Sequence, residues 1–277
     1  MDRLDALLRR FSLSARMFHS GPLCGVTDFA PRHGLGQLHL VKRGPVFVEY
    51  GRRERRRVDR PSVVFTPKPL AHRFTTDADI GADMACANVS FGGGGGPIAD
   101  ALPALVVMPL ADLDGAEALL DALFREAFGA ACGRQAVVDR LFEVVLIHIL
   151  RALMNAGAVR EGALAGLAHA QLARSLVAMH EAPGDTWPLE RLAQRAGMSR
   201  SHYAATFKTV VGATPGDYLG AYRICVAQDL LRRGHALKHV AANVGYGSVA
   251  ALSRAFKAAC GVSPREWKAG DAAQAPA

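Results

Sequence analysis

The sequence has no long apolar run, little cysteine and no start typical of a secretory signal. Its longest apolar stretch, VVLIHIL (Val144 to Leu150), contains a histidine and is far too short to span a membrane. The N-terminus MDRLDALLRRF lacks the apolar core and cleavage site of a signal peptide. Five scattered cysteines argue against the disulfide framework of a secreted domain. These absences predict a cytoplasmic globular protein without a membrane segment.

Acidic residues are scarce in one part of the chain. From Arg191 to Lys268 there are twelve Lys or Arg residues and three Asp or Glu residues, whereas residues 1–166 carry twenty basic and eighteen acidic residues. The 277 residues are enough for two domains. A basic domain attached to a nearly neutral one predicts a polyanionic partner, such as nucleic acid, for the basic part.

The first hundred residues have the pattern of short antiparallel strands. GQLHLVKRGPVFVEYG (Gly36 to Gly51) and RPSVVFTPKPLAHRF (Arg60 to Phe74) alternate apolar and polar residues and are interrupted by Gly and Pro. After Leu110 the spacing becomes helical, and RQAVVDRLFEVVLIHILRALM is apolar nearly all round. Such a helix is buried on more than one side, either against a second subunit or inside a monomer. The first alternative predicts a homodimer through the helix around 134–155.

The C-terminal third contains an internal repeat. LERLAQRAGMSRSHYAATFKTVVGATPGDY (Leu189 to Tyr218) matches LKHVAANVGYGSVAALSRAFKAACGVSPREW (Leu237 to Trp267), with one extra residue in the second copy. Each copy has a short amphipathic helix, a glycine suited to a left-handed turn, and a serine, Ser199 or Ser248, placed to cap a second helix. The pattern predicts two helix-turn-helix motifs whose second helices enter a major groove.

The segment between the two copies, TPGDYLGAYRICVAQDLLRRG, predicts a linker helix. Thr214, Pro215 and Asp217 stand in the order of an N-cap and first turn, and Gly234 closes the helix. About twenty helical residues span about 30 Å, so the two reading helices are expected about one DNA turn apart. The residues expected to be buried by the reading helices are Tyr203, Phe207, Val210, Leu252, Phe256 and Ala259.

The opposite faces of the reading helices carry the candidate DNA contacts. Arg254 is the candidate for a bidentate contact to guanine, worth about 1–3 kcal/mol of discrimination between bases. Arg200 and the two lysines are candidates for phosphate contacts. Alanines at exposed positions favour contacts to thymine methyl groups or readout of DNA shape. The ten candidates are Arg200, Ser201, Ala204, Ala205, Lys208, Val249, Ala250, Ser253, Arg254 and Lys257.

The tandem motif resembles the AraC/XylS family of bacterial transcription regulators. The resemblance covers roughly Leu167 to Trp267 and rests on LAQRAGMS, FKTVVGATPGDYL, YRICVAQDLL, VAANVGYGS and FKAACGVSPREW. It implies binding to double-stranded promoter DNA and, most often, transcriptional activation through RNA polymerase. The N-terminus resembles the cupin-like sensor domain common in this family, through HLVKRGPVFVEYG, VVFTPKPLAHRF and ACANVSF.

Together these features predict an α+β protein of two domains. Residues 1–160 are expected to form a cupin-like antiparallel β-barrel for sensing and dimerisation, closed by about residue 100 and followed by helices. Residues 161–170 are the expected linker. Residues 171–277 are expected to form an all-α DNA-binding domain with two helix-turn-helix motifs joined by a linker helix.

Histidines and cysteines of the expected barrel form a candidate metal site. Enzymatic cupins hold a metal with closely spaced histidines and a carboxylate, but Gln37 stands where a ligand would be, which disfavours oxygenase chemistry. A subgroup of these regulators, which includes sensors of reactive chlorine, has a cysteine, two histidines and a cysteine in order, a tetrahedral zinc set. The resemblance implies that zinc is held here and that oxidation to a disulfide between the two cysteines removes two ligands. The four residues are Cys24, His39, His72 and Cys86.

The sequence leaves three alternatives open. In the first, the barrel binds a small organic effector without a metal, and its cysteines and histidines are core residues. In the second, the protein is a cupin enzyme with an accessory DNA-binding domain. In the third, the helical domain binds nucleic acid without sequence preference, so that Arg254→Ala weakens binding to all DNA equally.

Overall fold

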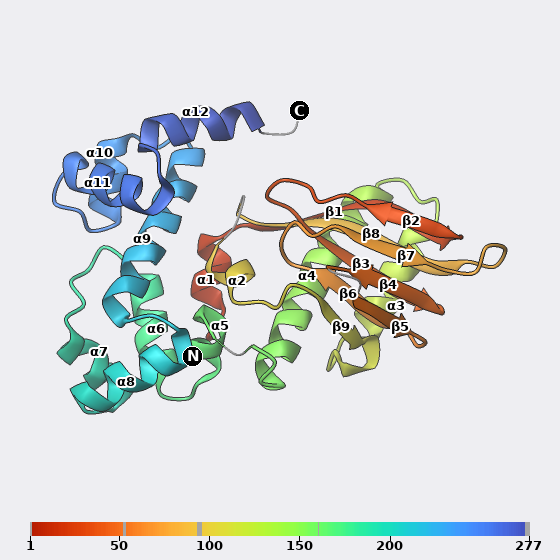
Figure 1. The fold of residues 1–277 in the computed structure, drawn as a ribbon, viewed down its shortest axis with the longest axis horizontal. Coiled ribbons are helices and arrows are strands. Elements are labelled where there is room, and N and C mark those ends of the chain that lie inside the picture. The colour runs from red at the N-terminus through yellow and green to blue at the C-terminus, as the bar shows by residue number, and fades with distance from the viewer. Residues whose placement is uncertain (1, 52–53, 93–95, 160, 275–277) are drawn as a thin grey trace. The chain divides into compact units, whose positions relative to one another are not determined.

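The computed structural model describes residues 2–51, 54–92, 96–159 and 161–274. The chain divides into two compact units, Ser12–Val159 and Arg160–Ala277 together with Met1–Phe11. The first unit is built on antiparallel sheets and the second is helical, which confirms the predicted fold class (Figure 1). The division differs from the predicted boundaries at the N-terminus, and a short helix, α5 (Ala163–Ala168), stands inside the expected linker. The expected limits at 1, 160 and 277 lie outside the described residues.

The N-terminal unit contains two antiparallel sheets. One has the strand order β1-β8-β3-β6-β9, and the other has the order β2-β7-β4-β5. Successive side chains along each strand point to opposite faces of its sheet. Each sheet turns one face toward the other sheet, so every second side chain of a strand points into the space between them. The strands are β1 (Leu13–Leu23), β2 (Val26–Phe29), β3 (Gly36–Arg43), β4 (Val46–Tyr50), β5 (Glu54–Val58), β6 (Ser62–Thr66), β7 (His72–Thr75), β8 (Ala82–Phe91) and β9 (Val106–Pro109).

The apolar core lies between the two sheets. Val41 and Met84 of the five-stranded sheet pack there with Val48 and Phe74 of the four-stranded sheet. The outer face of the five-stranded sheet is covered by α3 (Glu117–Ala127) and α4 (Arg134–Asn155), with α4 against β1. The predicted helices after Leu110 are therefore present, and they close one side of the sheet.

The sheet extends beyond residue 100, where the barrel was predicted to close. β9 pairs with β6, for example through Val107 and Val64. A short helix, α2 (Pro97–Asp100), precedes β9, and a 3-10 helix, η1 (Leu110–Asp112), follows it. The run VVMP is too short to stand out as a strand by its own periodicity, since it gains its partners only from tertiary structure.

The second unit is helical throughout, as predicted. Its first helix, α1, comes from the N-terminus and packs against α6, with Leu7 fully buried. None of the described helices is long and apolar enough to cross a membrane. The helices besides α5 are α1 (Asp5–Arg10), α6 (Leu172–Glu181), α7 (Leu189–Ala196), α8 (Arg200–Val211), α9 (Pro215–Arg232), α10 (Leu237–Asn243), α11 (Val249–Cys260) and α12 (Pro264–Gln274).

Candidate functional site

The two reading helices, α8 and α11, begin at the predicted serine caps. The Ser199 hydroxyl accepts a hydrogen bond from the His202 backbone N–H at 3.4 Å. The Ser248 hydroxyl accepts one from the Ala251 backbone N–H at 3.1 Å. Each helix ends at a glycine in the left-handed conformation, which glycine adopts without strain. The local rules of helix capping thus define both motifs.

The buried faces of the reading helices are mostly the predicted ones. Val210 and Ala259 are exceptions, because Val210 is half-buried and Ala259 is exposed. Val211 is buried instead, since it continues the four-residue spacing of the aromatic residues before it. The residues that anchor the two helices, each without exposed surface, are Tyr203, Phe207, Leu252 and Phe256.

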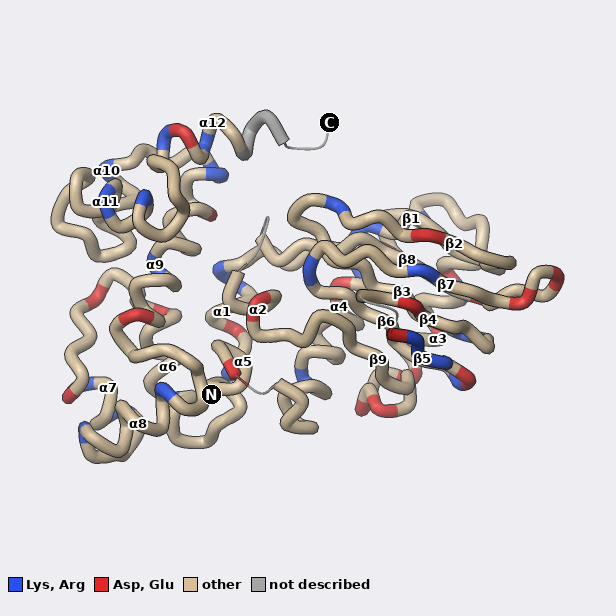
Figure 2. Tube along the Cα trace, in the orientation of Figure 1, with Lys and Arg blue, Asp and Glu red and all other residues tan. Residues whose placement is uncertain are grey.

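The ten candidate DNA contacts lie on the remaining faces. Arg200 forms an ion pair with Glu190 of α7 at 2.8 Å, and both side chains are largely exposed. Figure 2 shows basic residues on both reading helices. The exposed candidates are Arg200, Ser201, Ala205, Lys208, Ala250, Arg254 and Lys257, and the half-buried ones are Ala204, Val249 and Ser253.

The linker helix α9 connects the two motifs as predicted. Thr214 caps it, accepting from the Asp217 backbone N–H at 3.2 Å and donating to the Asp217 carboxylate at 2.7 Å. The helix ends at Arg232, slightly before the predicted Gly234. Arg232 lies over the ring of Trp267 in α12, 4.7 Å from its centroid. The Thr214 cap holds the start of α9 and the Arg232–Trp267 contact holds its end, so α9 is a defined spacer between the reading helices.

In the N-terminal unit, His39 and His72 meet between the two sheets. Their Nε2 atoms are 2.9 Å apart, and His72 Nδ1 lies 2.9 Å from the Leu70 carbonyl oxygen. Because a carbonyl only accepts, His72 Nδ1 carries the hydrogen and His72 Nε2 is an acceptor. His39 Nε2 must then donate, which leaves His39 Nδ1 as a buried acceptor. That atom has no partner among the described residues.

The environment keeps these side chains uncharged. Burial, followed by the repulsion that a protonated His39 would meet from protonated His72 and His19, holds the pKa of His39 well below its ordinary value. Burial also lowers the pKa of His72, against the opposing effect of its bond to Leu70. Cys86 is fully buried, and burial raises the pKa of its thiol. Neutral imidazole is the form that binds metals.

A bulge in β1 brings a further histidine to this group. Met17 pairs with Ala87, whereas His19 pairs with Cys86, so Phe18 is the extra residue. Since Ala87 and Cys86 point to opposite faces of the sheet, the bulge turns His19 to the face of Cys86. Sequence reasoning missed His19, because simple alternation places it on the same face as Met17.

Helix α4 holds this bulge. The Asp139 carboxylate accepts from the Met17 backbone N–H at 2.7 Å, and the Gln135 amide donates to the Met17 carbonyl at 3.1 Å. His39 also pairs with Cys86 across the strands, so His19 and His39 flank Cys86 on one face. His19 Nε2 is buried and has no partner within the described residues.

Cys24 does not join this group. Leu23 pairs with Ala82, so Cys24 lies about five residues along the strand from the level of Cys86, roughly 16 Å at about 3.3 Å per residue. A disulfide needs Cα atoms within about 7 Å, so the implied Cys24–Cys86 bond does not fit this fold. Cys24 is also exposed. Of the four predicted ligands, the structure brings His39, His72 and Cys86 together and leaves Cys24 apart.

The group is not a preformed metal centre. Within the described part of the chain, no three His, Cys, Asp or Glu side chains are placed to hold one metal ion. The Nε2 atoms of His39 and His72 are 2.9 Å apart. Two nitrogen ligands of a tetrahedral zinc ion, with Zn–N bonds of about 2.0–2.1 Å, lie about 3.3 Å apart. His72 already donates its other ring N–H to a carbonyl, the arrangement that orients metal-binding histidines.

Two protein families match this chain. The family described as Cupin matches residues 2–155, and the family described as Helix-turn-helix domain matches residues 192–270. The first match covers more than half of the chain and includes all the strands. The second includes both reading helices and the linker helix.

Similar proteins include named transcription regulators. The RCS-specific HTH-type transcriptional activator RclR of Escherichia coli (strain K12) is 25% identical over 276 residues, 96% of this chain and 97% of RclR. An AraC-like transcription regulator of Streptomyces lividans is 38% identical over 174 residues, 61% of this chain. The match spans 57% of that relative's length.

One solved structure that resembles the helical unit is the DNA-binding domain of AdpA in complex with a target DNA. It is 30% identical, and the likeness covers 38% of this chain and 95% of that chain, with a TM-score of 0.36. By the family matches, the chain belongs to the cupin family through residues 2–155, and its residues 192–270 form a helix-turn-helix domain of the AraC type, similar to that of the AraC-like relatives.

Proposed function

We propose that this protein activates transcription by reading two successive major-groove segments of promoter DNA. The observation that carries the proposal is the pair of capped, basic reading helices joined by one helix. α9 has 18 residues, about 27 Å at 1.5 Å per residue. That length is comparable with a DNA turn of about 34 Å, the spacing of two reading helices on one face of the duplex.

Within this interface we assign base readout to Arg254 and phosphate contacts to Arg200, Lys208 and Lys257. Arg254 is exposed on α11, on the face opposite the anchoring Phe256. A guanidinium there can donate two hydrogen bonds to one guanine, whereas a lysine acts as a point charge toward phosphate. The alanines and Val249 have apolar side chains, so we assign contacts to thymine methyl groups and readout of DNA shape to this part of the surface.

Competition binding with single-base variants of a selected DNA site tests this assignment. Arg254→Ala should cost about 5- to 150-fold, or 1–3 kcal/mol, and abolish the preference at one base pair. Lys257→Ala, the control, should weaken binding to all sequences alike. An equal loss on every sequence for Arg254→Ala would show non-specific binding instead.

Activation through RNA polymerase and dimerisation through α4 are further parts of the proposal. The name of RclR describes an activator, which supports the sign of regulation. Val137 and Val144 of α4 are 45% and 42% exposed and lie two helical turns apart on one side. Val144→Glu should convert a dimer to a monomer in sedimentation equilibrium, and an unchanged mass would contradict this interface.

For the signal, we propose that the cupin domain senses oxidants through a zinc-bound thiol, a role that the name of RclR also suggests. His39, His72 and Cys86 lie close together and would become its ligands after a small rearrangement, and His19, which flanks Cys86, replaces Cys24 as the proposed fourth ligand. The His39–His72 pair would open by about 0.4 Å from its 2.9 Å separation to the spacing that zinc requires. A bound zinc ion would stabilise the thiolate form of Cys86, which is the form that oxidants attack.

Cobalt(II) titration tests the ligand set, because a thiolate ligand gives an intense ultraviolet charge-transfer band. His39→Ala and His19→Ala each remove a proposed ligand and should weaken cobalt binding at least tenfold, since even the loss of an outer-shell partner costs about 10- to 100-fold. Cys24→Ser is the matched control and should bind cobalt like the wild type. A Cys24→Ser protein that loses the band would restore the four-residue set implied by the sequence.

A second candidate is an organic effector in the barrel without a metal. A cavity of about 550 Å³ at the end of the four-stranded sheet favours it. Phe29, Tyr50 and His72 line this cavity together with the Asp28–Arg73 ion pair, whose atoms are 2.7 Å apart. Metal-free protein whose DNA binding responds to an organic ligand, with unreactive Cys86, would favour this candidate. The named relatives are regulators, and we propose no catalytic activity.

A further inference from the structure

The second helix-turn-helix motif packs against the loop that leads into the first. Gly184 lies in this loop, between α6 and α7, and Asn243 and Gly245 lie at the turn between α10 and α11. A Cβ atom on Gly184 would stand 2.8 Å from the Asn243 carbonyl oxygen, and one on Gly245 would stand 2.5 Å from the Gly184 carbonyl oxygen. Neither distance leaves room for a side chain, so the two backbones are in direct contact.

The turn of the first motif is not packed in this way. Gly197 is the equivalent of Gly245 in the repeat, and both have the left-handed conformation, with φ of 67° and 76°. A Cβ atom on Gly197 would meet nothing within 4 Å among the described residues. The first turn therefore requires glycine only for its backbone conformation, whereas the second requires it for close packing as well.

Arg223 of α9 joins the loop to the second turn. Its Nε donates to the Pro183 carbonyl at 2.7 Å, and its Nη2 donates to the Asp185 carbonyl at 2.8 Å. The same Nη2 atom would lie 2.9 Å from a Cβ atom on Gly245. The planar fork of arginine serves both carbonyls at once, which the point charge of a lysine does not. One half-buried guanidinium thus contacts the loop before α7 and the turn before α11.

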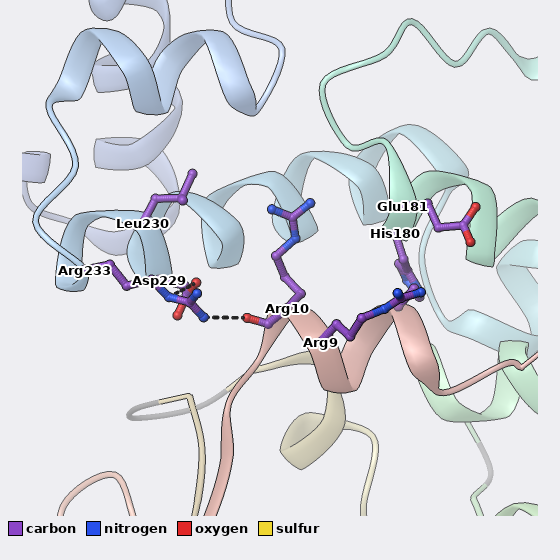
Figure 3. A pocket seen from close by; sticks show the side chains of 8 residues that line it. Arg9, Arg10, His180, Glu181, Asp229, Leu230 and Arg233 are labelled. Atoms are coloured by element: carbon purple, nitrogen blue, oxygen red, sulfur yellow. Dashed lines mark hydrogen bonds and ion pairs between the residues drawn. The ribbon is translucent and has the colours of Figure 1, made fainter.

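The helix that carries Arg223 is itself held by α6 and α1. His180 of α6 is 1% exposed, and its Nε2 atom lies 2.6 Å from the Tyr218 hydroxyl of α9. After the end of α9, Arg233 donates to the Arg10 carbonyl of α1 at 3.2 Å (Figure 3). Arg223 therefore extends from a helix whose place in the unit is fixed.

We propose that Arg223 is a positioning residue that limits the protein to one spacing between two DNA segments, an inference that rests on the proposed reading of two segments. Helix α9 sets the distance between the motifs, and the contacts of Arg223 set their orientation. One inserted base pair moves the second segment by about 3.4 Å along the DNA and about 35° around it. Two reading helices held in one orientation fit only one such arrangement. Arg223 acts through the orientation of α11 and not through a DNA contact of its own.

Competition binding of the full-length protein to variants of a selected DNA site tests the proposal. The variants have one base pair more or one fewer between the two protected segments. The wild type should prefer the correct spacing at least about fivefold, the lower end of what one mismatched base pair costs. Arg223→Lys keeps the charge but not the fork, and should lower this preference to about twofold or less. The preference is a ratio of two affinities of one sample, so it does not change with the folded fraction.

Two glycine substitutions separate packing from backbone strain. Gly245→Ala and Gly197→Ala each place a side chain on a residue with positive φ, which costs stability in both variants. Only the methyl group of Gly245→Ala meets the loop, so this variant should lose the spacing preference, and Gly197→Ala, its matched control, should retain it. Arg174→Lys, at an exposed arginine of α6, is the control for Arg223→Lys and should also retain it.

The outcomes separate this proposal from the proposed function. An unchanged spacing preference in Arg223→Lys overturns the proposal and leaves the reading of two segments intact. An equal loss in Gly245→Ala and Gly197→Ala also overturns it, since backbone strain then accounts for the effect. If the wild type binds all spacings equally, the reading of two segments is wrong and this proposal fails with it.

Discussion

Mild acid should destabilise the helical unit through His180. Burial lowers the pKa of this ring from 6.5 to about 3. In the unfolded chain the ring takes up a proton as the pH falls below about 6.5, whereas in the folded state it stays neutral down to about 3. Stability is therefore fully present above pH 6.5 and is lost progressively as the pH falls toward 3.

The size of this loss follows from the pKa difference. One pKa unit corresponds to about 1.4 kcal/mol, so lowering the pH from 7.5 to 4.5 should remove about 2.5 kcal/mol from the free energy of unfolding. The loss is of the same order as a buried core truncation, and it should level off below pH 3. His180→Gln keeps an amide near the Tyr218 hydroxyl but does not titrate, so this part of the pH dependence should vanish.

Tryptophan fluorescence during urea unfolding measures the free energy of unfolding of the helical unit. The sequence has two tryptophans, Trp187 and Trp267, and both lie in the helical unit. His239→Gln, an exposed histidine of the same unit, is the control and should retain the wild-type pH dependence. If His180→Gln loses stability between pH 7.5 and 4.5 as steeply as the wild type, the argument from His180 is wrong.

Three further outcomes follow from the contacts described above. Ser248→Ala should destabilise α11 by about 1 kcal/mol through loss of its N-cap, seen as a lower urea midpoint of Trp267 fluorescence; an unchanged midpoint would contradict the capping role. Asp139→Ala removes the acceptor of the Met17 N–H and should weaken cobalt binding by relaxing the bulge that places His19; equal affinity would mean that the bulge is held without α4. Lys208→Ala should reduce the slope of log K against log salt by about 0.9, if it contacts one phosphate; an unchanged slope would remove it from the interface.

The helix-turn-helix motifs could be predicted in detail because their determinants are local. Ser199, Ser248 and Thr214 cap helices by accepting a hydrogen bond from the backbone N–H three residues later. Such rules act within one turn and need no knowledge of the fold. The misplaced residues, Val210 and Ala259, show the limit, because neighbouring positions of a helix differ by only 100° and packing selects between them.

The group of His19, His39, His72 and Cys86 could be predicted only in part, because a bulge changes the face of a strand. In Leu13–Leu23 the alternating pattern puts His19 in phase with Met17. The extra residue at Phe18 reverses that phase, and it is fixed by side chains of α4 more than 100 residues away in sequence. The family pattern includes Cys24, but the distance between two residues of a sheet depends on strand register, which the pattern does not contain.

Other differences have the same origin in tertiary contacts. β9 is a strand because β6 offers it an edge, and α1 belongs to the helical unit because Leu7 and Phe11 are buried there. Phe11 packs edge-on against Tyr222 at 5.8 Å between ring centroids. Neither feature has a periodic pattern long enough to reveal its partner.

The most direct test of the central claim is a hydroxyl-radical footprint of the full-length protein on DNA selected for tight binding. We expect two protected segments per subunit, about one helical turn or 10–10.5 base pairs apart. Arg254→Ala should abolish the base preference in one segment only. A single protected segment, or protection that ignores sequence, would contradict the claim that both helix-turn-helix motifs read DNA.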